Sequence, residues 1–506
     1  MGAVPATNLA LVPARARTAP KQKPKKAKLG LAFWMERVLE ECDRAAAGFE
    51  ADPVHDLRVA LRRCRSLADG LMAMDPDRSW KDMKKAGKKL FQALGDLRDM
   101  QVMKEWIEKL GDPDDPVVVK LLNHVEARET ECKQLAWKDL NQFDRKRWSQ
   151  WSRVLPRRAS RLRPGNPVYL HLALEKWTAA YELHKRAVRT RSQVALHELR
   201  IGIKRFRYTV ENFLPVQHGL WGEKLKELQD LLGEVHDLDV LWATALEIMA
   251  FPDPETRARW REKLNHERNQ RVERYRELMI GKQSLWRVWR GALPSGPELR
   301  AAALNRLRVW AGYIDPDFSH AQRVAQLSVH LYDGLRAAHL LGEGRERDSR
   351  DVLEAAAFMH DVGRAKGNQN HQKKSFRMIM KLSRPLGWSA RELELAAVVA
   401  RYHRGALPTP RRKIMQRLEL PDRHLALELA GVLRLAKALD THDGTRPKIT
   451  IESRDHLLLV HAAGYSPLDR SAEEVAASRH LLETVIHRAI MVRTLRVAPR
   501  RYGRPS

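Results

Sequence analysis

The sequence predicts a mainly α-helical protein: a pseudo-two-fold bundle of two helical repeats, followed by a second all-helical domain that carries a small β-hairpin. Three observations support this fold class. Apolar residues recur at helical spacing over most of the chain. Two blocks of sequence occur twice in the same order. Residues 449–462 show two short runs around a polar turn, which is the pattern of a hairpin.

The chain is long enough for several cores and is strongly basic. Its 506 residues exceed what one core usually organises, and 43% of them are apolar, so several folded domains are expected. No apolar run is long enough to predict a membrane span. Three unclustered cysteines indicate a reducing cytoplasm and no thiolate metal site. The net charge of +29 indicates a polyanionic partner: nucleic acid, a phosphate polymer or an anionic membrane.

Proline- and glycine-rich breaks divide the chain. The first residues are rich in Lys and Arg and lack the apolar stretch of a secretory signal. The segment GALPSGPE at 291–298 marks a junction between two helical regions. The expected organisation is a flexible basic tail at 1–29, an N-terminal domain at 30–280 with repeats at about 30–150 and 165–280, a linker at 281–299, and a C-terminal domain at 300–495.

An internal repeat organises the N-terminal domain. The block HDLRVALRRCR at 55–65 matches HELRIGIKRFR at 197–207, and LGDLRDMQV at 94–102 matches LGEVHDLDV at 232–240. Two matched blocks in the same order and at nearly one spacing indicate two related helical halves. We expect these halves to pack with pseudo-two-fold symmetry.

Each copy of the first block places basic residues along one helix face, opposite an apolar face that docks on its own half. The two faces consist of His55, Arg58, Arg62 and Arg65, and of His197, Arg200, Lys204 and Arg207. Lys81, Lys84 and Lys88 form another basic row on the next predicted helix, and Lys84 and Lys88 are counted among the candidate ligands. Like charges at this spacing repel by a few tenths of a kcal/mol per pair. A bound anion removes the repulsion and accepts charge-assisted hydrogen bonds, often bidentate ones from arginine.

Other interpretations of the basic faces stay open at this stage. They can be solvated helix surfaces, or they can pair with carboxylates of the protein itself. Asp99 and Asp237, which follow a base in each second block, are interpreted as supports that orient the neighbouring cations. Nucleic acid is a less favoured partner, because base stacking needs aromatic residues among the cations and these helices offer only Phe206 and Tyr208.

The pattern H-x-L-R-x-x-x-R-R-x-R followed by L-G-x-x-R-D, with its second copy, resembles the conserved histidine α-helical domain, CHAD. The resemblance covers about residues 30–280. It implies a helical, two-fold pseudosymmetric domain associated with binding of inorganic polyphosphate. It further implies that a polyanion cavity is lined by His55, Arg58, Arg62, Arg63, Arg65, His197, Arg200, Lys204, Arg205 and Arg207.

Histidines and acids are concentrated in the C-terminal domain. His320 opens a helical stretch, and the adjacent His360 and Asp361 end an apolar run. His371, RYHR at 401–404 and LRLAKALD at 433–440 follow. Nitrogen and carboxylate ligands without thiolates suit a divalent Mg, Mn, Fe, Co, Ni or Zn ion. Such an ion could activate water against a phosphate ester or anhydride, although scattered structural histidines are an equal alternative.

This region is similar to the HD-type domain at the C-terminus of exopolyphosphatase and guanosine pentaphosphatase proteins, through MHDVG at 359–363 and the motifs around it. The resemblance implies metal ligands at His320, His360, Asp361 and a downstream acid, for which Asp440 is the candidate. Two lysines, Lys374 and Lys437, lie where the family often has ligands. An ammonium group there would repel an ion or would bind phosphate directly.

The favoured function from the sequence is binding of inorganic polyphosphate, or a similar polyanion, with the HD-type domain in a regulatory or accessory role. The alternative is a metal-dependent phosphohydrolase acting on polyphosphate or phosphorylated nucleotides, and nucleic-acid binding is the weaker alternative. No catalytic residue is assigned, because the actin-like catalytic part of the phosphatases is not found in this sequence. The expected location is the cytoplasm, in association with polyphosphate granules.

Overall fold

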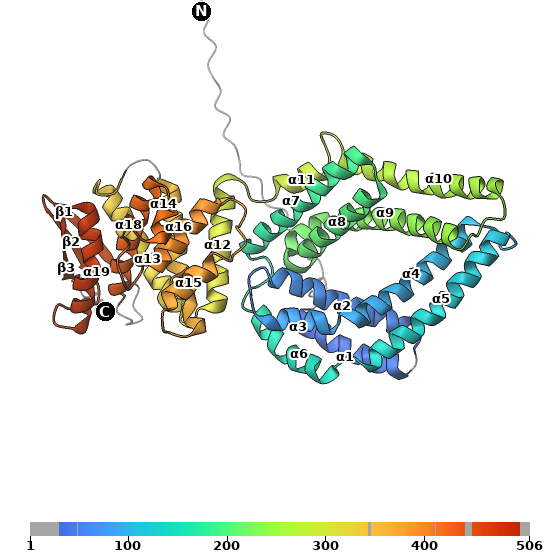
Figure 1. Ribbon diagram of the computed structural model, residues 1–506, viewed down its shortest axis with the longest axis horizontal. Coiled ribbons are helices and arrows are strands. Elements are labelled where there is room, and N and C mark those ends of the chain that lie inside the picture. Colours follow the sequence, from blue (N-terminus) through green and yellow to red (C-terminus); the bar gives the residue numbers. More distant parts are fainter. Residues whose placement is uncertain (1–29, 48, 343–345, 410, 441–447, 496–506) are drawn as a thin grey trace, which may run out of the picture.

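The structure of the chain is a computed structural model, and it describes residues 30–495 except 48, 343–345, 410 and 441–447. The predicted basic tail at 1–29 lies outside the described residues. As predicted, helices make up most of the fold, and the described strands form one small sheet near the C-terminal end (Figure 1).

The N-terminal domain consists of two related sets of helices (Figure 1). The first set is α1 (Leu31–Ala47), α2 (Ala51–Leu71), α3 (Arg78–Ala86), α4 (Lys88–Leu110), α5 (Pro116–Asn141) and α6 (Arg145–Ala159). The second set is α7 (Pro167–Thr190), α8 (Gln193–Phe213), α9 (Pro215–Glu247), α10 (Pro254–Met279) and α11 (Leu285–Gly291). The repeated sequence blocks fall on α2 and α8 and on α4 and α9, so the repeat is structural.

The two sets meet where α2 packs on α8 and α4 packs on α9. The apolar faces of the helices form one core that runs through both sets. Farther out, the hairpins α4–α5 and α9–α10 extend side by side and share a smaller core around Trp106 and Trp260 (Figure 1). Lys120 Nζ donates to the carbonyl oxygen of Met249 at 2.8 Å and thereby joins the far ends of the two hairpins.

The segment expected as a linker at 281–299 is largely helical. It contains α11, and Trp286 and Trp289 of this helix are buried in the core of the N-terminal domain. The next helix, α12, begins at Gly296. Most of this segment is therefore folded, because burial of its apolar side chains stabilises it. Its proline and glycine content alone had indicated a linker.

The C-terminal domain packs helices around a second core and carries the sheet at its far end. Its helices are α12 (Gly296–Ile314), α13 (Phe318–Ala337), α14 (Glu346–Met359), the 3-10 turn η1 (Val362–Lys366), α15 (His371–Ile379), α16 (Ala390–Arg401), α17 (Lys413–Gln416), α18 (Leu420–Ala438) and α19 (Arg470–Ile486). The strands are β1 (Ile449–Arg454), β2 (Leu457–Ala462) and β3 (Ala489–Thr494).

The sheet contains the predicted hairpin and one more strand. β1 and β2 pair antiparallel, and β3 adds to β2 in parallel. The sequence pattern after the hairpin predicts a final helix over roughly 471–494, but α19 ends at Ile486, and His487 adopts a left-handed backbone conformation with φ 52°. Beyond it, Ile490 and Val492 are buried on one face of β3. This alternation is the period of a strand, which explains the correction.

The two domains contact each other directly through α7 and α12. Tyr313 donates to the carbonyl oxygen of Arg158 at 3.1 Å, and an ion pair joins Arg306 to Glu175. The His171 Nε2 atom lies 2.9 Å from the carbonyl oxygen of Leu386. Within the described part of the chain, no helix combines the length and the apolar character that crossing a membrane requires.

Candidate functional site

The repeated helices α2 and α8 direct their basic faces toward the junction between the two sets. Their apolar faces are anchored in the core, with Leu57 and Leu61 of α2 and Leu199 and Ile203 of α8 fully buried. The start of α8 is fixed because the Ser192 hydroxyl accepts a hydrogen bond from the backbone of Ala195. Burial of one face leaves the opposite face of each helix near the contacts that α2 makes with α8 and with α4.

Four predicted cations from the two repeats come together there. Burial is the largest of the causes that lower the pKa of the Lys204 ammonium to about 8, and the nearby charges of Arg200 and Arg58 act in the same direction. Arg62 acts on Lys204 in the same direction. Since α2 supplies Arg58 and Arg62 while α8 supplies Arg200 and Lys204, the cluster depends on both halves. We call these four residues the junction cluster.

Arg58 is held within the junction cluster by α4. Its guanidinium lies 5.4 Å from the centre of the Phe91 ring, and a Cβ placed on Gly95 would be 3.7 Å from one of its nitrogens. The Arg58 Nε atom is buried and has no hydrogen-bond partner among the described residues. Within the same part of the chain, none of the four cations forms an ion pair with a carboxylate. The cluster therefore carries positive charge that the described structure does not neutralise by direct contact.

Two carboxylates lie near the junction cluster. Burial raises the pKa of Asp99, and the charges of Arg58 and Arg200 oppose this rise. Burial also raises the pKa of Asp237 to about 6, against the opposing charge of Arg200. Both acids were interpreted from the sequence as supports for the cations, and the structure places them beside Arg58 and Arg200.

A pair of histidines borders the cluster on the side of the second repeat. His197 of α8 and His236 of α9 approach with their Nδ1 atoms 3.3 Å apart. Burial, together with the charge of Arg200, lowers the pKa of His236 to about 4. His236 was not a candidate ligand from the sequence. The signal that could have found it is its position in the second repeated block, one residue before Asp237.

Several other candidates are engaged by the protein itself. The Arg63 guanidinium is 2.6 Å from a carboxylate oxygen of Glu211, and that of Arg207 is 3.7 Å from the same group. Arg207 also donates to Gln229 at 2.8 Å. These contacts join α2 to α8 and α8 to α9. Intramolecular pairing, an alternative left open by the sequence, therefore holds for Arg63 and Arg207.

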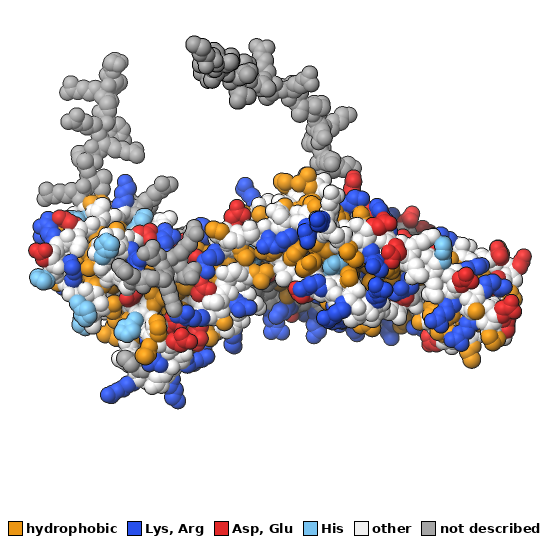
Figure 2. Space-filling model, turned by 90° about the horizontal axis from the view of Figure 1, so that it is seen from above, with side chains coloured by type: hydrophobic (Ala, Val, Ile, Leu, Met, Phe, Trp, Pro, Cys, Tyr) orange, Lys and Arg blue, Asp and Glu red, His pale blue; other side chains and the backbone are white. Residues whose placement is uncertain are grey.

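The remaining candidates lie outside the junction cluster as well. Arg65 donates to the carbonyl oxygen of Lys84 at 2.7 Å, and the Lys84 ammonium pairs with Asp69. The other three candidates, His55, Lys88 and Arg205, are exposed. Basic side chains also occur along the whole length of the face seen in Figure 2, so exposure alone does not distinguish these residues from the general basic surface.

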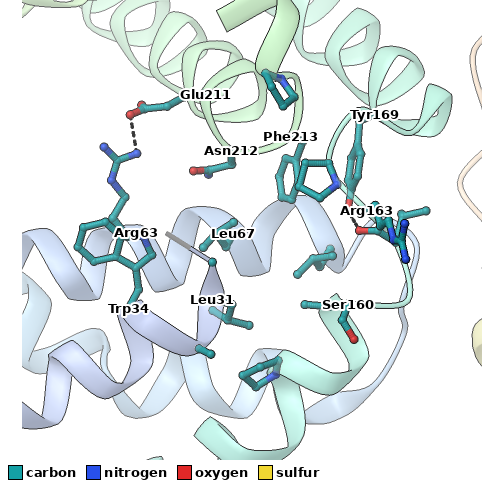
Figure 3. A pocket seen from close by; sticks show the side chains of 18 residues that line it. Leu31, Trp34, Arg63, Leu67, Ser160, Arg163, Tyr169, Glu211, Asn212 and Phe213 are labelled. Carbon is teal, nitrogen blue, oxygen red and sulfur yellow. Dashed lines mark hydrogen bonds and ion pairs between the residues drawn. The ribbon is translucent and has the colours of Figure 1, made fainter. Parts of the chain in front are cut away.

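A cavity of about 830 Å³ lies beside the contact of α2 with α8 but differs in chemistry from the junction cluster. Figure 3 shows Trp34, Leu67 and Phe213 in its lining, and apolar side chains from α1, α6 and α7 add to them. Its Arg63 is the one that Glu211 neutralises. The lining also includes the exposed Arg163, but its mostly apolar character does not suit a polyanion.

The C-terminal domain contains a buried histidine cluster around Asp361. His360 and Asp361 follow α14, His371 begins α15, and His403 follows α16. The Asp361 Oδ1 atom lies 3.0 Å from His371 Nε2, 3.3 Å from His403 Nε2 and 3.6 Å from His360 Nε2. All four side chains are at most 3% exposed as residues. Helix ends from three elements thus converge on one carboxylate oxygen.

The tautomers of the three histidines follow from their other ring nitrogens. In His360, His371 and His403, the Nδ1 atom lies 2.7, 3.0 and 2.7 Å from the carbonyl oxygen three residues earlier. A carbonyl oxygen only accepts, so Nδ1 carries the proton and Nε2 presents a lone pair. Burial lowers the pKa of His360 to about 3, which keeps this ring neutral.

Asp440, the predicted fourth metal ligand, is held away from this cluster. Its carboxylate lies 2.6 Å from His320 Nδ1 and accepts hydrogen bonds from Arg323 at 2.7 and 3.0 Å. Burial favours the protonated acid, but the contacts with His320 and Arg323 hold the pKa of Asp440 well below its usual range. Asp440 therefore contacts His320 and does not approach Asp361. His371 and His403, which were not among the predicted ligands, approach Asp361 instead.

The two lysines that depart from the family pattern behave differently. Lys374 donates to the carbonyl oxygens of Lys366 and Gly367 at 2.6 and 3.1 Å and so points away from the histidines. The Lys437 ammonium lies 3.6 Å from Asp361 Oδ1. Among the described residues, two groups could hold a metal ion, and they are His320, His360 and Asp361, and Asp361, His371 and His403.

Comparisons with known proteins agree with both parts of this description. Residues 34–247 match the family model of the CHAD domain, and residues 310–466 match that of the Ppx/GppA phosphatase, domain III. Among solved structures, the chain is similar to the CHAD domain from the plant Ricinus communis, with 20% identity and a TM-score of 0.36, over 52% of this chain and 90% of that one. No curated protein matches the chain.

Proposed function

This chain carries a CHAD domain joined to a Ppx/GppA phosphatase domain III, and we propose that it binds inorganic polyphosphate at the junction cluster. The two domain matches indicate a polyphosphate-related function. The observation that carries the finer proposal is that two cations from each repeat gather at one place without a described ion pair. A cytoplasmic location with access to polyphosphate granules fits this proposal.

Electrostatics favours an anion at the junction cluster. Arg58, Arg62, Arg200 and Lys204 repel one another, and partial burial removes water that would otherwise screen them. Burial lowers the pKa of Arg58, and the charge of Arg62 acts in the same direction, so the site disfavours its own positive charge. A bound anion removes this penalty and accepts short charge-assisted hydrogen bonds from the guanidiniums. The nearby acids Asp99 and Asp237 offset only part of the charge, since burial favours their protonated forms.

The arrangement suits an anion whose charges repeat along its length. Arg58 and Arg62 are one helical turn apart, about 6 Å along α2. Arg200 and Lys204 repeat that spacing on α8. The four cations therefore form two rows of positive charge, one on each helix, and not one compact charge. Arginine presents a rigid fork that matches phosphate oxygens, whereas lysine contributes a compact charge. A phosphate polymer satisfies both rows at once.

Nucleic acid is less well supported by the surroundings of the cluster. The Phe91 ring beside it is covered by Arg58 and Arg65, whose guanidiniums lie 5.4 and 5.1 Å from its centre. A base therefore cannot stack on this ring without displacing two cations. Single-strand binding sites usually combine a basic groove with open aromatic faces.

The proposal is tested by charge reversal at the cluster. Arg58→Glu combined with Arg200→Glu should weaken polyphosphate binding, measured by titration calorimetry, by at least 100-fold. The matched control combines Arg257→Glu with Arg287→Glu, two exposed arginines on α10 and α11. Both double variants change the net charge equally, so the control should lose less than fivefold. Circular dichroism confirms that each variant keeps its helices.

Equal losses in the two double variants would assign binding to the general basic surface and would end the proposal. Competition supplies a second comparison. Polyphosphate should displace single-stranded RNA at fixed salt, and RNA should not displace polyphosphate at equal phosphate concentration. The opposite order of displacement would support the nucleic-acid alternative.

The buried histidine cluster favours a second candidate function, metal-dependent phosphohydrolysis by the C-terminal domain. Its carboxylate and imidazole groups are of the kinds that hold ions which activate water. Release of phosphate from polyphosphate with added Mn²⁺ or Mg²⁺ tests it, with Asp361→Asn as the inactive comparison. No release above that of Asp361→Asn would exclude this activity on polyphosphate.

A further inference from the structure

The cavity beside the contact of α2 with α8 has a fixed aromatic wall (Figure 3). The Phe213 ring stacks on the Tyr169 ring, with ring centres 4.3 Å apart and ring planes 14° apart. Both residues are at most 3% exposed. A Cβ on Gly70 would lie 2.1 Å from the nearest carbon of the Phe213 ring, so the ring lies directly against α2 only because this residue is glycine. The packing of the protein itself therefore forms the wall, without the help of a ligand.

The cavity is large enough for a small molecule. Pockets that hold such ligands usually enclose about 300–1,000 Å³ and are lined mostly by apolar and aromatic side chains. The volume of about 830 Å³ falls within this range, and the lining is drawn from α1, α2, α6, α7 and α8. Water against an apolar lining finds few hydrogen-bond partners, so an apolar ligand that replaces it is stabilised.

The polar side chains of the lining are largely bound to other groups of the protein. The Arg63 guanidinium is 2.6 Å from a carboxylate oxygen of Glu211. Asn212 Nδ2 donates to the Ser66 hydroxyl at 3.0 Å, and the Tyr169 hydroxyl donates to a backbone carbonyl oxygen at 3.3 Å. A sugar, a base or a phosphate chain needs partners for each of its buried polar atoms, and few groups are left to provide them. The lining therefore favours a ligand with an apolar body.

One end of the cavity is positively charged. In Figure 3, Arg163 and Ser160 lie at the opposite end of the lining from Arg63. Arg163 is exposed and forms no ion pair with any carboxylate in the described part of the chain. Arg157 and Arg161, which are also exposed, lie at the same end of α6. An anionic group at this rim gains charge-assisted hydrogen bonds from a guanidinium and keeps part of its hydration.

We propose that this cavity binds an anionic amphiphile, with an aliphatic chain against the aromatic wall and a carboxylate at Arg163. Charge complementarity at the rim selects a fatty acid over the neutral alcohol of the same chain length. The inference does not depend on polyphosphate binding, because no residue of the junction cluster belongs to the lining.

The test is a calorimetric titration of the full chain with dodecanoate below its micelle concentration. The wild type should bind one equivalent. Ala159→Phe places a ring in the cavity and should weaken binding by about 30-fold or more, since the space is no longer open. The matched control is Ala179→Phe, the same change at an exposed position of α7 outside the lining, and it should alter the affinity by less than threefold. Neither variant changes the net charge, so unspecific attraction of the anion is equal in both.

Arg163→Gln separates the contribution of the charge from that of the chain. It should weaken dodecanoate binding by about tenfold and leave dodecanol binding unchanged. Ser160→Phe narrows the cavity from its exposed rim and replaces Ala159→Phe in the comparison if melting curves show that Ala159→Phe is unfolded. The inference is overturned if the wild type binds no dodecanoate, if the cavity-filling variant binds it as well as Ala179→Phe, or if Arg163→Gln changes both affinities by the same factor.

Two further arms separate this site from other sources of binding. The double variant Arg58→Glu with Arg200→Glu should keep its dodecanoate affinity within threefold, so a failure of the polyphosphate site leaves this test intact. Vesicles of anionic phospholipid should not compete with dodecanoate for the cavity. Binding to such vesicles that the cavity-filling variant abolishes, without binding of free dodecanoate, would overturn the inference in favour of a membrane contact.

Discussion

Polyphosphate binding should weaken by about tenfold between pH 7 and pH 9, because Lys204 loses its proton in this interval. Burial holds the pKa of this ammonium at about 8 in the free protein, with Arg200 and Arg58 adding to the effect. Arg62 also disfavours the charge, and the carboxylate of Asp99 favours it. Four groups from α2, α4 and α8 thus act on Lys204, and three of them oppose its protonation.

The sign follows from what a polyanion does to this balance. Bound phosphates favour the ammonium and raise its pKa toward or above the usual value for lysine, near 10.4. The affinity is therefore fully present below the free-protein pKa of about 8 and is lost as the pH rises above it. Lys204 is about nine-tenths protonated at pH 7 and one-tenth at pH 9, which gives roughly a tenfold loss, or about 1.4 kcal/mol.

Titration calorimetry at fixed ionic strength measures this dependence directly. Lys204→Arg provides the control, because a guanidinium keeps its charge throughout the interval. The variant should bind polyphosphate with nearly the same affinity at pH 7 and pH 9. Asp237 and His236, with pKa values of about 6 and about 4, titrate mainly below pH 7 and leave the interval to Lys204. A flat profile for the wild type, or an equal slope in Lys204→Arg, would refute the reasoning.

Three further outcomes are expected. Raising the salt concentration from 50 to 200 mM should reduce polyphosphate affinity by roughly 100-fold if four phosphates are neutralised, and a salt-independent affinity measured by calorimetry would contradict an electrostatic site. Arg63→Ala leaves the buried Glu211 without its nearest partner and should lower the free energy of unfolding by about 3 kcal/mol in denaturant titrations, whereas an unchanged midpoint would show the pair to be energetically neutral. Gly363→Ala should lower the melting temperature, because a Cβ at this position would lie 2.1 Å from the backbone carbonyl oxygen of His371, and a variant with the wild-type melting temperature would contradict this close approach of η1 to α15.

The sequence determined the fold class and the pairing of the repeats. Helical periodicity and the two repeated blocks are local signals. They indicate which residues of a helix are buried, and this does not depend on which other element the helix packs against. The buried faces of α2 and α8 were therefore predictable down to Leu61 and Ile203, and the family-model matches confirm the resemblances drawn from the same motifs. The hairpin was predictable for the same reason.

Periodicity could not separate free cations from paired ones. Arg62 and Arg63 are neighbours in sequence, yet one joins the junction cluster and the other meets Glu211 of the second repeat. The difference arises because adjacent residues on a helix point about 100° apart, and only the packing of α2 against α8 decides what lies in each direction. The strand β3 depended likewise on a partner, β2, that is distant in sequence.

The buried histidine cluster shows this division most clearly. The His360–Asp361 pair is visible in the sequence, because the two residues are adjacent and follow an apolar run. His371 and His403 approach Asp361 from separate helix ends. Asp440 lies at yet another helix end and contacts Arg323 instead. Spacing along the chain determines which side chains share a helix face. Which helices meet is determined by the packing of their apolar faces, and this packing is known only from the tertiary structure.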